Sequence, residues 1–359
     1  MLNLNKFMNI DGFGLLQEEK NALLSEFLQN LTIFHHSNCI RYRKMIDILE
    51  YNLEIPNPLI SEIPFLPVSL FKKLDLKSID DSQVFKTLYS SGTSGQSASK
   101  IFLDKETAIS QQKALIKTVT DFTGLKRTPM LIIDSQNVLK NRDAYSARGA
   151  AILGFSLFGS DRCFALNDNE QLDIKKVQTF LEKHEGKQIF IFGFTFMIWN
   201  YFYLQLKQMN QQLNLANATL IHGGGWKRMQ NKSVSKAKFK HALKEISGIK
   251  RIHDYYGMVE QTGSVFLECT GGNFHAGIFG DVIIRRPSDF KTCKFGEEGL
   301  IQVVSVLPKS YCGHSLLTED RGVMLGSDDC SCGRPGSYFQ VRGRVEHTEL
   351  RGCSDTYGL

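Results

Sequence analysis

Short apolar runs alternate with helical patterns through the middle of this 359-residue chain. Three such runs, residues 130–134, 188–192 and 218–221, contain few polar side chains, which is typical of strands that are covered on both faces. The stretches between them have helical spacing, as around residues 177–180. Because parallel strands are joined by crossover helices, this order predicts an α/β fold with a mixed or parallel sheet flanked by helices.

The first part of the chain has a different pattern, in which apolar residues recur at helical spacing between residues 17 and 51. We expect a helical N-terminal cap over residues 1–80 that belongs to the main domain. His35 and His36 would interrupt it as a turn, since on a helix adjacent side chains point about 100° apart and could not chelate one metal ion. Pro64 and Pro67 predict an extended segment late in this cap, after its helical stretch.

The net charge is mild at +6 and the basic residues are scattered, so we expect no nucleic-acid partner; a site for anionic phosphates would account for the same excess. The N-terminus lacks the apolar core of a signal peptide. The longest apolar run, residues 189–204, is too short for a membrane helix and contains polar residues. These features predict a cytoplasmic protein without a transmembrane segment, whose eight cysteines are reduced thiols.

A loop rich in hydroxyls and glycines, residues 89–100, lies between two apolar segments. Glycine lets the backbone approach an anion, while N–H groups, hydroxyls and a lysine bind phosphate oxygens. Because the flanking residues 83–88 and 101–103 have the pattern of strands, the stretch predicts a strand-loop-strand phosphate clamp; a flexible connector is the alternative. The residues expected to bind phosphate are Ser90, Ser91, Gly92, Thr93, Ser94, Gly95 and Lys100.

Two later strands each end in glycine. Residues 218–221 lead into Gly223, Gly224 and Gly225, and the carboxyl end of a strand is where open α/β sheets bind ligands; a tight turn is the alternative. A strand that begins near residue 250 ends at Tyr256 and Gly257. The carboxylate of Glu260 follows, and it could equally stabilise the N-terminus of a helix.

Taken in order, these motifs resemble those of the acyl-adenylate-forming enzymes. The phrase His-Gly-Gly-Gly-Trp-Lys at residues 222–227 is similar to that of the bacterial acyl-protein synthetases in particular. The resemblance implies an adenylate-forming N-terminal-type domain that uses ATP and Mg²⁺. It implies that residues 89–100 hold the phosphates, that the three glycines and the Tyr256-Gly257 pair contact adenine, and that Glu260 holds Mg²⁺.

The resemblance also extends to the C-terminal part of the chain. Asp320 matches the aspartate that takes the ribose hydroxyls, with Glu319 as the neighbour that could be confused with it, and Arg344 matches an arginine that approaches the nucleotide. Two departures concern the phosphates: Val259 stands where threonine is usual, and about one extra residue precedes Lys100.

The resemblance divides the chain into the cap, a core over residues 81–342, and a hinge with a short tail over residues 343–359. Full acyl-CoA ligases continue into a mobile lid domain, most of which we expect to be missing here. Cys353 lies in an Arg-Gly-Cys setting similar to that of the acyl-accepting cysteine of acyl-protein synthetases. Because positive charge from Arg351 favours a thiolate, we expect an acyl acceptor rather than an inert terminal thiol.

Soft metal ligands occur in two pairs about sixty residues apart. Cys269 with His275, and Cys330 with Cys332, would form a closed tetrahedral set for structural zinc if their loops meet. Similar pairs hold zinc in relatives that resemble phenylacetate-CoA ligases. Unrelated surface thiols are the alternative.

The resemblance thus implies an ATP-dependent ligase that activates a carboxylic acid, expected to be a fatty acid, to acyl-AMP. Lys100, Glu260 and Cys353 would have the catalytic roles, and the acyl group would pass from Cys353 to a protein partner such as an acyl reductase. Two alternatives remain open at this point. One is a ligase that transfers the acyl group to coenzyme A or another acceptor in polysaccharide or natural-product synthesis, and the other is an inactive nucleotide-binding scaffold.

Overall fold

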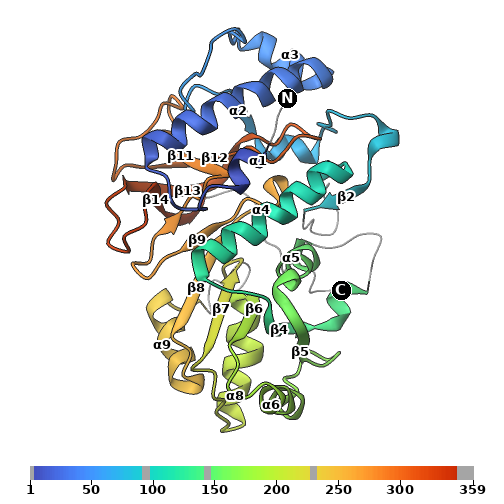
Figure 1. The fold of residues 1–359 in the computed structure, drawn as a ribbon, viewed down its shortest axis with the longest axis vertical. Helices are drawn as coiled ribbons and strands as arrows, with labels where there is room; N and C mark the ends of the chain where they lie inside the picture. The colour runs from blue at the N-terminus through green and yellow to red at the C-terminus, as the bar shows by residue number, and fades with distance from the viewer. Residues whose placement is uncertain (1–3, 91–97, 141–146, 227–232, 346–359) are drawn as a thin grey trace. The chain divides into compact units, whose positions relative to one another are not determined.

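The computed structural model describes residues 4–90, 98–140, 147–226 and 233–345, and these form two compact units (Figure 1). Unit 1 comprises the described residues up to Thr123 and those from Gly257 onward, whereas unit 2 lies within Gly124–Tyr256. The chain therefore enters unit 2 after helix α4 and leaves it at the Tyr256-Gly257 pair. The expected division at residues 80 and 342 stays a prediction.

Unit 2 contains the parallel sheet that the alternating pattern predicts. Its strands lie in the order β5-β4-β6-β7-β8, and every neighbouring pair is parallel. Side chains of β6 and β7 are buried along their whole length, which explains why these strands have continuous apolar runs. The strands are β4 (Thr128–Ser135), β5 (Gly159–Leu166), β6 (Ile189–Phe194), β7 (Ala218–Gly223) and β8 (Arg251–Tyr256).

Helices connect these strands, as the crossover rule requires. After β6 the chain turns directly into a helix whose middle part, Ile198–Tyr203, is a π-helix, so the long apolar run of residues 189–204 is a strand followed by a helix, as expected. The helices of unit 2 are α5 (Ala147–Phe155), α6 (Ile174–Lys183), α7 (Thr195–Met197), α8 (Leu204–Gln208) and α9 (Lys236–Ser247), with short 3₁₀ turns at Gln136–Leu139 and Ser156–Phe158.

Unit 1 contains an antiparallel sheet in the order β11-β12-β13-β14-β10-β9. The proline-bearing segment adds the short strand β1 (Leu66–Pro67) parallel to β13, in agreement with the extended conformation that its prolines predict. The other strands are β9 (Phe266–Glu268), β10 (Phe274–His275), β11 (Gly280–Arg285), β12 (Glu298–Ser305), β13 (Ser315–Ser327) and β14 (Ser337–Arg344), and β2 (Lys86–Tyr89) pairs with β3 (Lys100–Leu103) as a separate hairpin.

Helices α1 (Asn5–Met8), α2 (Gln17–Asn38) and α4 (Lys105–Thr123) pack on this antiparallel sheet, and α3 (Ile40–Ile48) follows α2. Short 3₁₀ turns lie at Val68–Lys72, Asp81–Gln83 and Val259–Gln261. The core of unit 1 joins side chains of α1, α2 and α4 to β11 and β12, among them Phe7, Leu28, Ala114, Ile283 and Val304. Among the described residues, no helix has the length and apolar character to cross a membrane.

The expected turn at the paired histidines is wrong, because α2 continues through both of them to Asn38. The chain instead breaks at Cys39, whose extended backbone (φ −126°, ψ 102°) separates α2 from α3. His35 is fully buried, whereas His36 lies at the surface, where its Nε2 pairs with Asp47 at 2.7 Å. The physical reason is that burial of His35 among polar partners stabilises the helical conformation at this position.

A chain of hydrogen bonds fixes the neutral form of His35. Its Nε2–H donates to the carbonyl of Pro308 at 3.1 Å, so Nδ1 must accept, and the Ser78 hydroxyl lies 2.7 Å from it. The Cys312 thiol lies 3.5 Å from the same hydroxyl and can donate to it. Burial lowers the pKa of His35 from 6.5 to about 3, against the opposing effect of the hydrogen bond to Pro308, so the imidazole is neutral at pH 7.

His314 lies next to His35 and is also held neutral. The two imidazoles stack with centroids 4.9 Å apart. The Thr32 hydroxyl donates to Leu28, so the His314 Nε2–H must donate to Thr32, at 3.0 Å. Burial, followed by the proximity of His35, places the pKa of His314 well below its usual value.

We therefore predict that acid destabilises unit 1. Below about pH 6.5 the unfolded chain binds protons at these histidines and the folded chain does not, so the free energy of unfolding falls as pH falls, by at most about 1.4 kcal/mol per pH unit for each histidine. Urea unfolding between pH 7 and pH 5 measures this slope. His35→Asn should flatten it, whereas His241→Asn, a change at an exposed histidine, should not; equal slopes in all three proteins would contradict the prediction.

Candidate active site

The two strands that were expected on either side of residues 89–100 are present. Strands β2 and β3 pair antiparallel on either side of the loop, with Tyr89 opposite Lys100. The loop ends are closed by two hydrogen bonds: the Ser90 N–H donates to the Ser99 carbonyl at 3.1 Å, and the Ser99 N–H donates to the Ser90 hydroxyl at 2.8 Å. The expected phosphate ligands Ser91, Gly92, Thr93, Ser94 and Gly95 lie outside the described residues.

Lys100 begins strand β3 and is exposed to solvent. Its Nζ lies 3.8 Å from the carboxylate of Asp75, a weak surface pair that an anion could displace. The position of this lysine is set by strand pairing, since it is opposite Tyr89 at the point where the hairpin opens into the loop.

Glu260 lies in the 3₁₀ turn Val259–Gln261 and is buried. Burial raises the pKa of its carboxyl, while the Ser99 hydroxyl beside it and the charges of Lys72 and Arg344 favour the ionised form. A carboxylate in such a place is stable only when positive charge or hydrogen-bond donors compensate for lost hydration. The alternative role at a helix N-terminus does not apply, because the turn spans only three residues.

Asp320 and Arg344 are brought together by the sheet. They are opposite each other in the register of β13 and β14, and Arg344 Nε donates to Asp320 Oδ1 at 3.3 Å. The neighbouring Glu319 instead faces Lys72, with 4.0 Å between Nζ and Oε1. Successive residues of a strand point to opposite faces, so Asp320 and Glu319 have distinct surroundings despite their adjacency.

Two residues of this site were not identified from the sequence. Ser99 lies at the end of the β2-β3 loop and favours the ionised form of Glu260, as does the charge of Lys72, which also lies 4.0 Å from Glu319. Lys72 stands in no recognisable motif, whereas Ser99 belongs to the loop of residues 89–100 but was not named among its expected phosphate ligands. The only signal was position, because Ser99 directly precedes Lys100 and Lys72 ends the turn that follows the two prolines.

The three glycines that the resemblance places against adenine lie where β7 ends in unit 2. Gly223 is the last residue of that strand, and a Cβ there would lie 2.6 Å from the ring of Tyr255 and 2.8 Å from its carbonyl oxygen. Gly224 and Gly225 have positive φ angles of 83° and 55°. Their arrangement is both a turn and an exposed stretch of bare backbone, so the two readings of this motif are compatible.

Tyr255 and Tyr256 point to opposite faces of the sheet, because they are successive residues of β8. The Tyr255 ring packs within unit 2, with its centroid 5.2 Å from Phe155 and 6.1 Å from Phe192. Tyr255 is therefore a half-buried residue that packs against Phe155 and Phe192. Tyr256 is directed the other way, and Gly257 after it is the first residue of unit 1.

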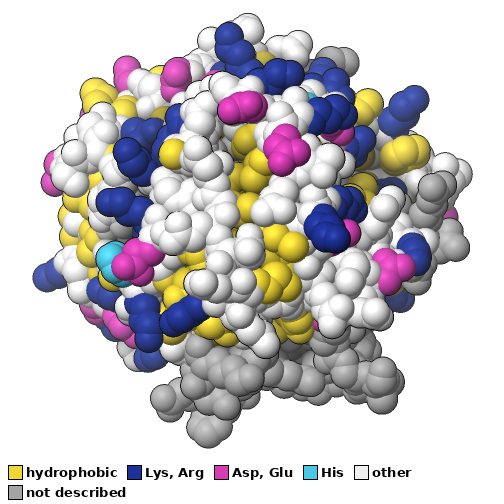
Figure 2. All heavy atoms as spheres, turned by 90° about the horizontal axis from the view of Figure 1, so that it is seen from below, with side chains coloured by type: hydrophobic (Ala, Val, Ile, Leu, Met, Phe, Trp, Pro, Cys, Tyr) yellow, Lys and Arg dark blue, Asp and Glu magenta, His cyan; other side chains and the backbone are white. Residues whose placement is uncertain are grey.

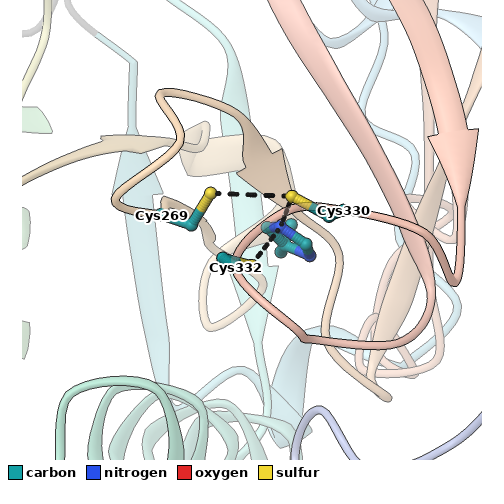
Figure 3. Close-up of side chains that lie close together, drawn as sticks. Cys269, Cys330 and Cys332 are labelled. Carbon is teal, nitrogen blue, oxygen red and sulfur yellow. Dashed lines mark hydrogen bonds between the residues drawn. The ribbon is translucent and has the colours of Figure 1, made fainter.

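Cys269, His275, Cys330 and Cys332 come together, although their two pairs are far apart in sequence. Their ligand atoms all lie within 4.8 Å of one another, and the hairpins β9-β10 and β13-β14 supply them (Figure 3). His275 Nε2 is 3.3 Å from the sulfur of both Cys330 and Cys332, and the sulfurs of Cys269 and Cys330 are 3.9 Å apart. In tetrahedral zinc sites with Zn–S bonds of about 2.3 Å, the sulfurs are about 3.8 Å apart.

The charges around this cluster suit a metal that binds thiolates. Burial, then Arg334 and Lys20, lowers the pKa of His275 to about 4, so its imidazole is neutral and able to act as a ligand. Burial raises the pKa of Cys269 to about 11, which disfavours its thiolate in the absence of a cation. The residues therefore fit a zinc ion, which would remove that penalty.

Of the remaining predicted residues, Cys353 lies outside the part of the chain that the structure describes. The described site residues form two groups. Unit 1 holds Ser90, Ser99, Lys100, Gly257, Glu260, Asp320 and Arg344, and unit 2 holds Gly223, Gly224, Gly225 and Tyr256.

Comparison with known proteins agrees with the motifs. The family described as Acyl-protein synthetase, LuxE, matches residues 4–358. The long-chain-fatty-acid–luciferin-component ligase of Vibrio harveyi is 25% identical over 357 residues, which cover 94% of this chain and 88% of that protein. The ligase of the same name from Aliivibrio fischeri is 23% identical over 350 residues, with the same coverage of both chains.

Solved structures resemble this one in fold. A 2-hydroxyisobutyryl-CoA ligase in the postadenylation state, in complex with 2-HIB-AMP, has a TM-score of 0.72 at 11% identity and covers 92% of this chain and 69% of its own. Its open conformation in complex with 2-HIB-AMP and CoA has a TM-score of 0.71 at 12% identity and covers 92% and 76%. The expected α/β fold of adenylate-forming enzymes is confirmed.

The two ends of the glycine motif make a matched pair for substitution. Gly223→Ala should lower the free energy of unfolding by about 2 kcal/mol, because the added Cβ meets the Tyr255 backbone, which cannot shift without disturbing the sheet. In Gly225→Ala the added Cβ meets no atom within 4 Å. The free energy of unfolding should therefore fall by only about 1 kcal/mol, the cost of placing alanine in a left-handed backbone conformation. Urea unfolding of the two variants checks this order, and a larger loss for Gly225→Ala would contradict the analysis.

Proposed function

The chain belongs to the acyl-protein synthetase family, a group of acyl-adenylate-forming ligases, and on that premise we propose that it activates a fatty acid with ATP and loads the acyl group onto its own Cys353. The two relatives named as long-chain-fatty-acid–luciferin-component ligases support this class of acid. The observation that carries the proposal is the environment of Glu260, a buried carboxylate beside a hydroxyl, Lys72 and Arg344.

In the first step the carboxylate oxygen of the acid attacks the α-phosphorus of ATP, and the bond to pyrophosphate breaks. We assign Lys100 and residues 90–95 to the phosphates, since a lysine at the end of a hairpin can follow the charge as it moves onto pyrophosphate. Asp320 would accept hydrogen bonds from the ribose hydroxyls, with Arg344 holding its carboxylate in place. The three glycines, Tyr256 and Gly257 would contact the adenine.

Glu260 has the donor chemistry for Mg²⁺. The ion prefers carboxylate and hydroxyl oxygens and usually holds substrate phosphates as well, and the structure places the Glu260 carboxylate beside the Ser99 hydroxyl. When bound, Mg²⁺ would supply positive charge for the phosphates. Burial raises the pKa of the Glu260 carboxyl, and Lys72 and Arg344 oppose this by favouring its ionised form.

In the second step the thiolate of Cys353 attacks the carbonyl carbon of acyl-AMP, a thioester forms, and AMP leaves with the bonding electrons. Activation is required because a carboxylate does not react with a thiol, whereas AMP is a good leaving group. The thioester would then pass to a protein partner such as an acyl reductase. A cytoplasmic location is part of this proposal, because ATP and reduced thiols are present there.

We also propose that Cys269, His275, Cys330 and Cys332 hold a structural zinc ion. Three sulfurs and one imidazole close the coordination sphere, so this site would have no open position for catalysis. By tying the β9-β10 hairpin to the β13-β14 hairpin, the ion would support β13 and β14, which position Asp320 and Arg344.

The first experiment is acid-dependent ATP–pyrophosphate exchange with short, long and aromatic carboxylic acids, on the wild type and on Cys353→Ser. We expect exchange with long-chain acids in both proteins, and an acyl adduct on the wild type only, detected by mass spectrometry. The variant should keep exchange because Cys353 acts after adenylation.

Other outcomes favour the alternatives. Release of free acyl-CoA that persists in Cys353→Ser would favour transfer to coenzyme A. Absence of exchange with every acid, from a folded sample that binds ATP, would contradict the ligase proposal and favour a scaffold.

Metal analysis tests the zinc proposal independently of activity. We expect about one zinc per chain in the purified protein, and Cys330→Ser should lose the metal and unfold at a lower urea concentration, because metal binding is coupled to folding. Cys293→Ser is the matched control, since Cys293 is also a buried thiol but lies outside the cluster. Equal zinc content in both variants would exclude the assigned ligands.

A further inference from the structure

Unit 2 contains a buried hydrogen-bonded pair that has no part in the steps above, and we propose that it positions the glycine motif, residues 223–225, for the nucleotide. The pair consists of Thr195, where β6 turns into α7, and His222, the residue before the last of β7. The contact of the motif with the nucleotide rests on the proposed function, whereas the hydrogen bonds that hold the motif do not.

The hydroxyl of Thr195 has one proton, and its two partners decide where that proton lies. Thr195 Oγ1 is 3.1 Å from the carbonyl oxygen of Gly223 and 2.8 Å from His222 Nδ1. Because a carbonyl oxygen can only accept, the hydroxyl donates to Gly223. The hydroxyl oxygen then accepts the Nδ1–H of His222, so the two bonds together assign one tautomer to the imidazole.

The charge beside the imidazole favours the same tautomer. Asp254 is opposite His222 in the β7-β8 register, and its Oδ1 lies 3.7 Å from Nδ1. A carboxylate near this nitrogen stabilises the hydrogen that the nitrogen carries. Lys236 Nζ lies 3.5 Å from the other carboxylate oxygen, so the carboxylate stands between a lysine and the imidazole. These contacts run across the carboxyl ends of three neighbouring strands, from β8 through β7 to β6.

The Thr195 hydroxyl extends the sheet beyond the point where β6 ends. The last residues that pair between β6 and β7 are Phe194 and Gly223, after which the chain turns into α7. The hydroxyl then bonds the Gly223 carbonyl from the side of β6. Since the C=O and N–H of a trans peptide point in opposite directions, the N–H of Gly224 is directed away from β6. The bond therefore sets the orientation of the first peptide unit of the motif.

Glycine does not determine that orientation by itself. Gly224 and Gly225 are exposed and have positive φ angles, and glycine loses more conformational freedom on folding than any other residue. A ligand that lies against bare backbone needs the peptide units at defined positions. Without the Thr195 bond, the ligand would have to order the turn as it binds, and its affinity would fall by that cost.

Thr195 and His222 act through the backbone that they hold, because both are buried. They are 7% and 4% exposed, and the ring of Phe239 from α9 packs on the imidazole with 4.8 Å between centroids. On the surface, by contrast, Figure 2 shows basic and acidic side chains interspersed among hydrophobic ones, so charge distinguishes no single site on that face. Thr195 and His222 are therefore positioning residues.

The test compares Thr195→Val with Thr195→Ser in ATP–pyrophosphate exchange with a long-chain acid. Valine keeps the shape of the side chain and removes the hydroxyl, whereas serine keeps the hydroxyl. We expect Thr195→Val to raise the KM for ATP about fivefold, the factor that one hydrogen bond of ordinary strength represents. Its kcat should change little, because the motif holds the nucleotide equally in the ground state and the transition state. Thr195→Ser should recover most of the wild-type KM.

Thr219→Val is the matched control, because Thr219 is a buried threonine near the amino end of β7 whose hydroxyl accepts from Gln188 at 3.4 Å. It should lower the urea midpoint much as Thr195→Val does and leave the KM for ATP unchanged. An equal rise in KM in both variants would overturn the proposal, because loss of stability alone would then explain it. A Thr195→Val protein with unchanged KM would overturn it as well.

A second pair of variants tests the role of His222. In His222→Asn the side-chain N–H takes the place of Nδ1–H and can still donate to Thr195, whereas His222→Leu has no donor. We expect the KM for ATP to be closer to that of the wild type in the asparagine variant than in the leucine variant. Equal KM values in the two would contradict the assigned tautomer and remove His222 from the pair.

Binding measured without turnover separates this inference from the proposed function. The chain contains two tryptophans, Trp199 and Trp226, whose ring centroids are 5.8 Å apart, and Trp226 directly follows the glycine motif. Their fluorescence during an ATP titration without acid, checked by equilibrium dialysis, gives the Kd for ATP. A wild type that binds ATP and exchanges no pyrophosphate would contradict the ligase proposal, while a higher Kd in Thr195→Val than in Thr219→Val would still support the pair. A wild type that binds no ATP would overturn both.

Discussion

The arrangement of unit 1 depends on one electrostatic constraint, the burial of the Glu260 carboxylate. Burial raises the pKa of this carboxyl, and groups from three segments that are distant in sequence favour its ionised form: Lys72 after the proline segment, Ser99 at the end of the β2-β3 loop, and Arg344 in the last described strand. Each of these segments is held by sheet or hairpin pairing, because β1 pairs with β13, β2 with β3, and β14 with β13. The sheet thus determines which groups surround the carboxylate.

The same sheet explains how residues from separate motifs, each of which is a weak sequence signal by itself, come close together. Asp320 and Arg344 lie 24 residues apart, yet antiparallel pairing puts them opposite each other. Two turns of the same sheet bring the Cys/His cluster together, and β10 and β14 pair at His275 and Tyr338 beside it. The cluster and the Asp320–Arg344 pair are therefore linked through one antiparallel ladder.

Much of unit 2 could be predicted because its strands are buried on both faces, so that β4, β6 and β7 appear in the sequence as nearly pure apolar runs. The family was also identifiable, since several motifs occur in order and the family match confirms them. Other features depend on tertiary contacts that leave no local pattern. His35 resembled a turn residue because its hydrogen-bond partners, Ser78 and Pro308, are far away in sequence. Lys72 and Ser99 acquire a role only through the position of Glu260.

In the β2-β3 hairpin, the position of Lys100 does not depend on the length of the loop that precedes it. Because Lys100 is aligned by pairing with Tyr89, and because Ser90 and Ser99 bridge the loop ends, residues added between them do not shift the lysine along the strand. Closing a slightly longer loop costs only a few tenths of a kcal/mol. The extra residue before Lys100 is therefore compatible with the usual placement of the charge.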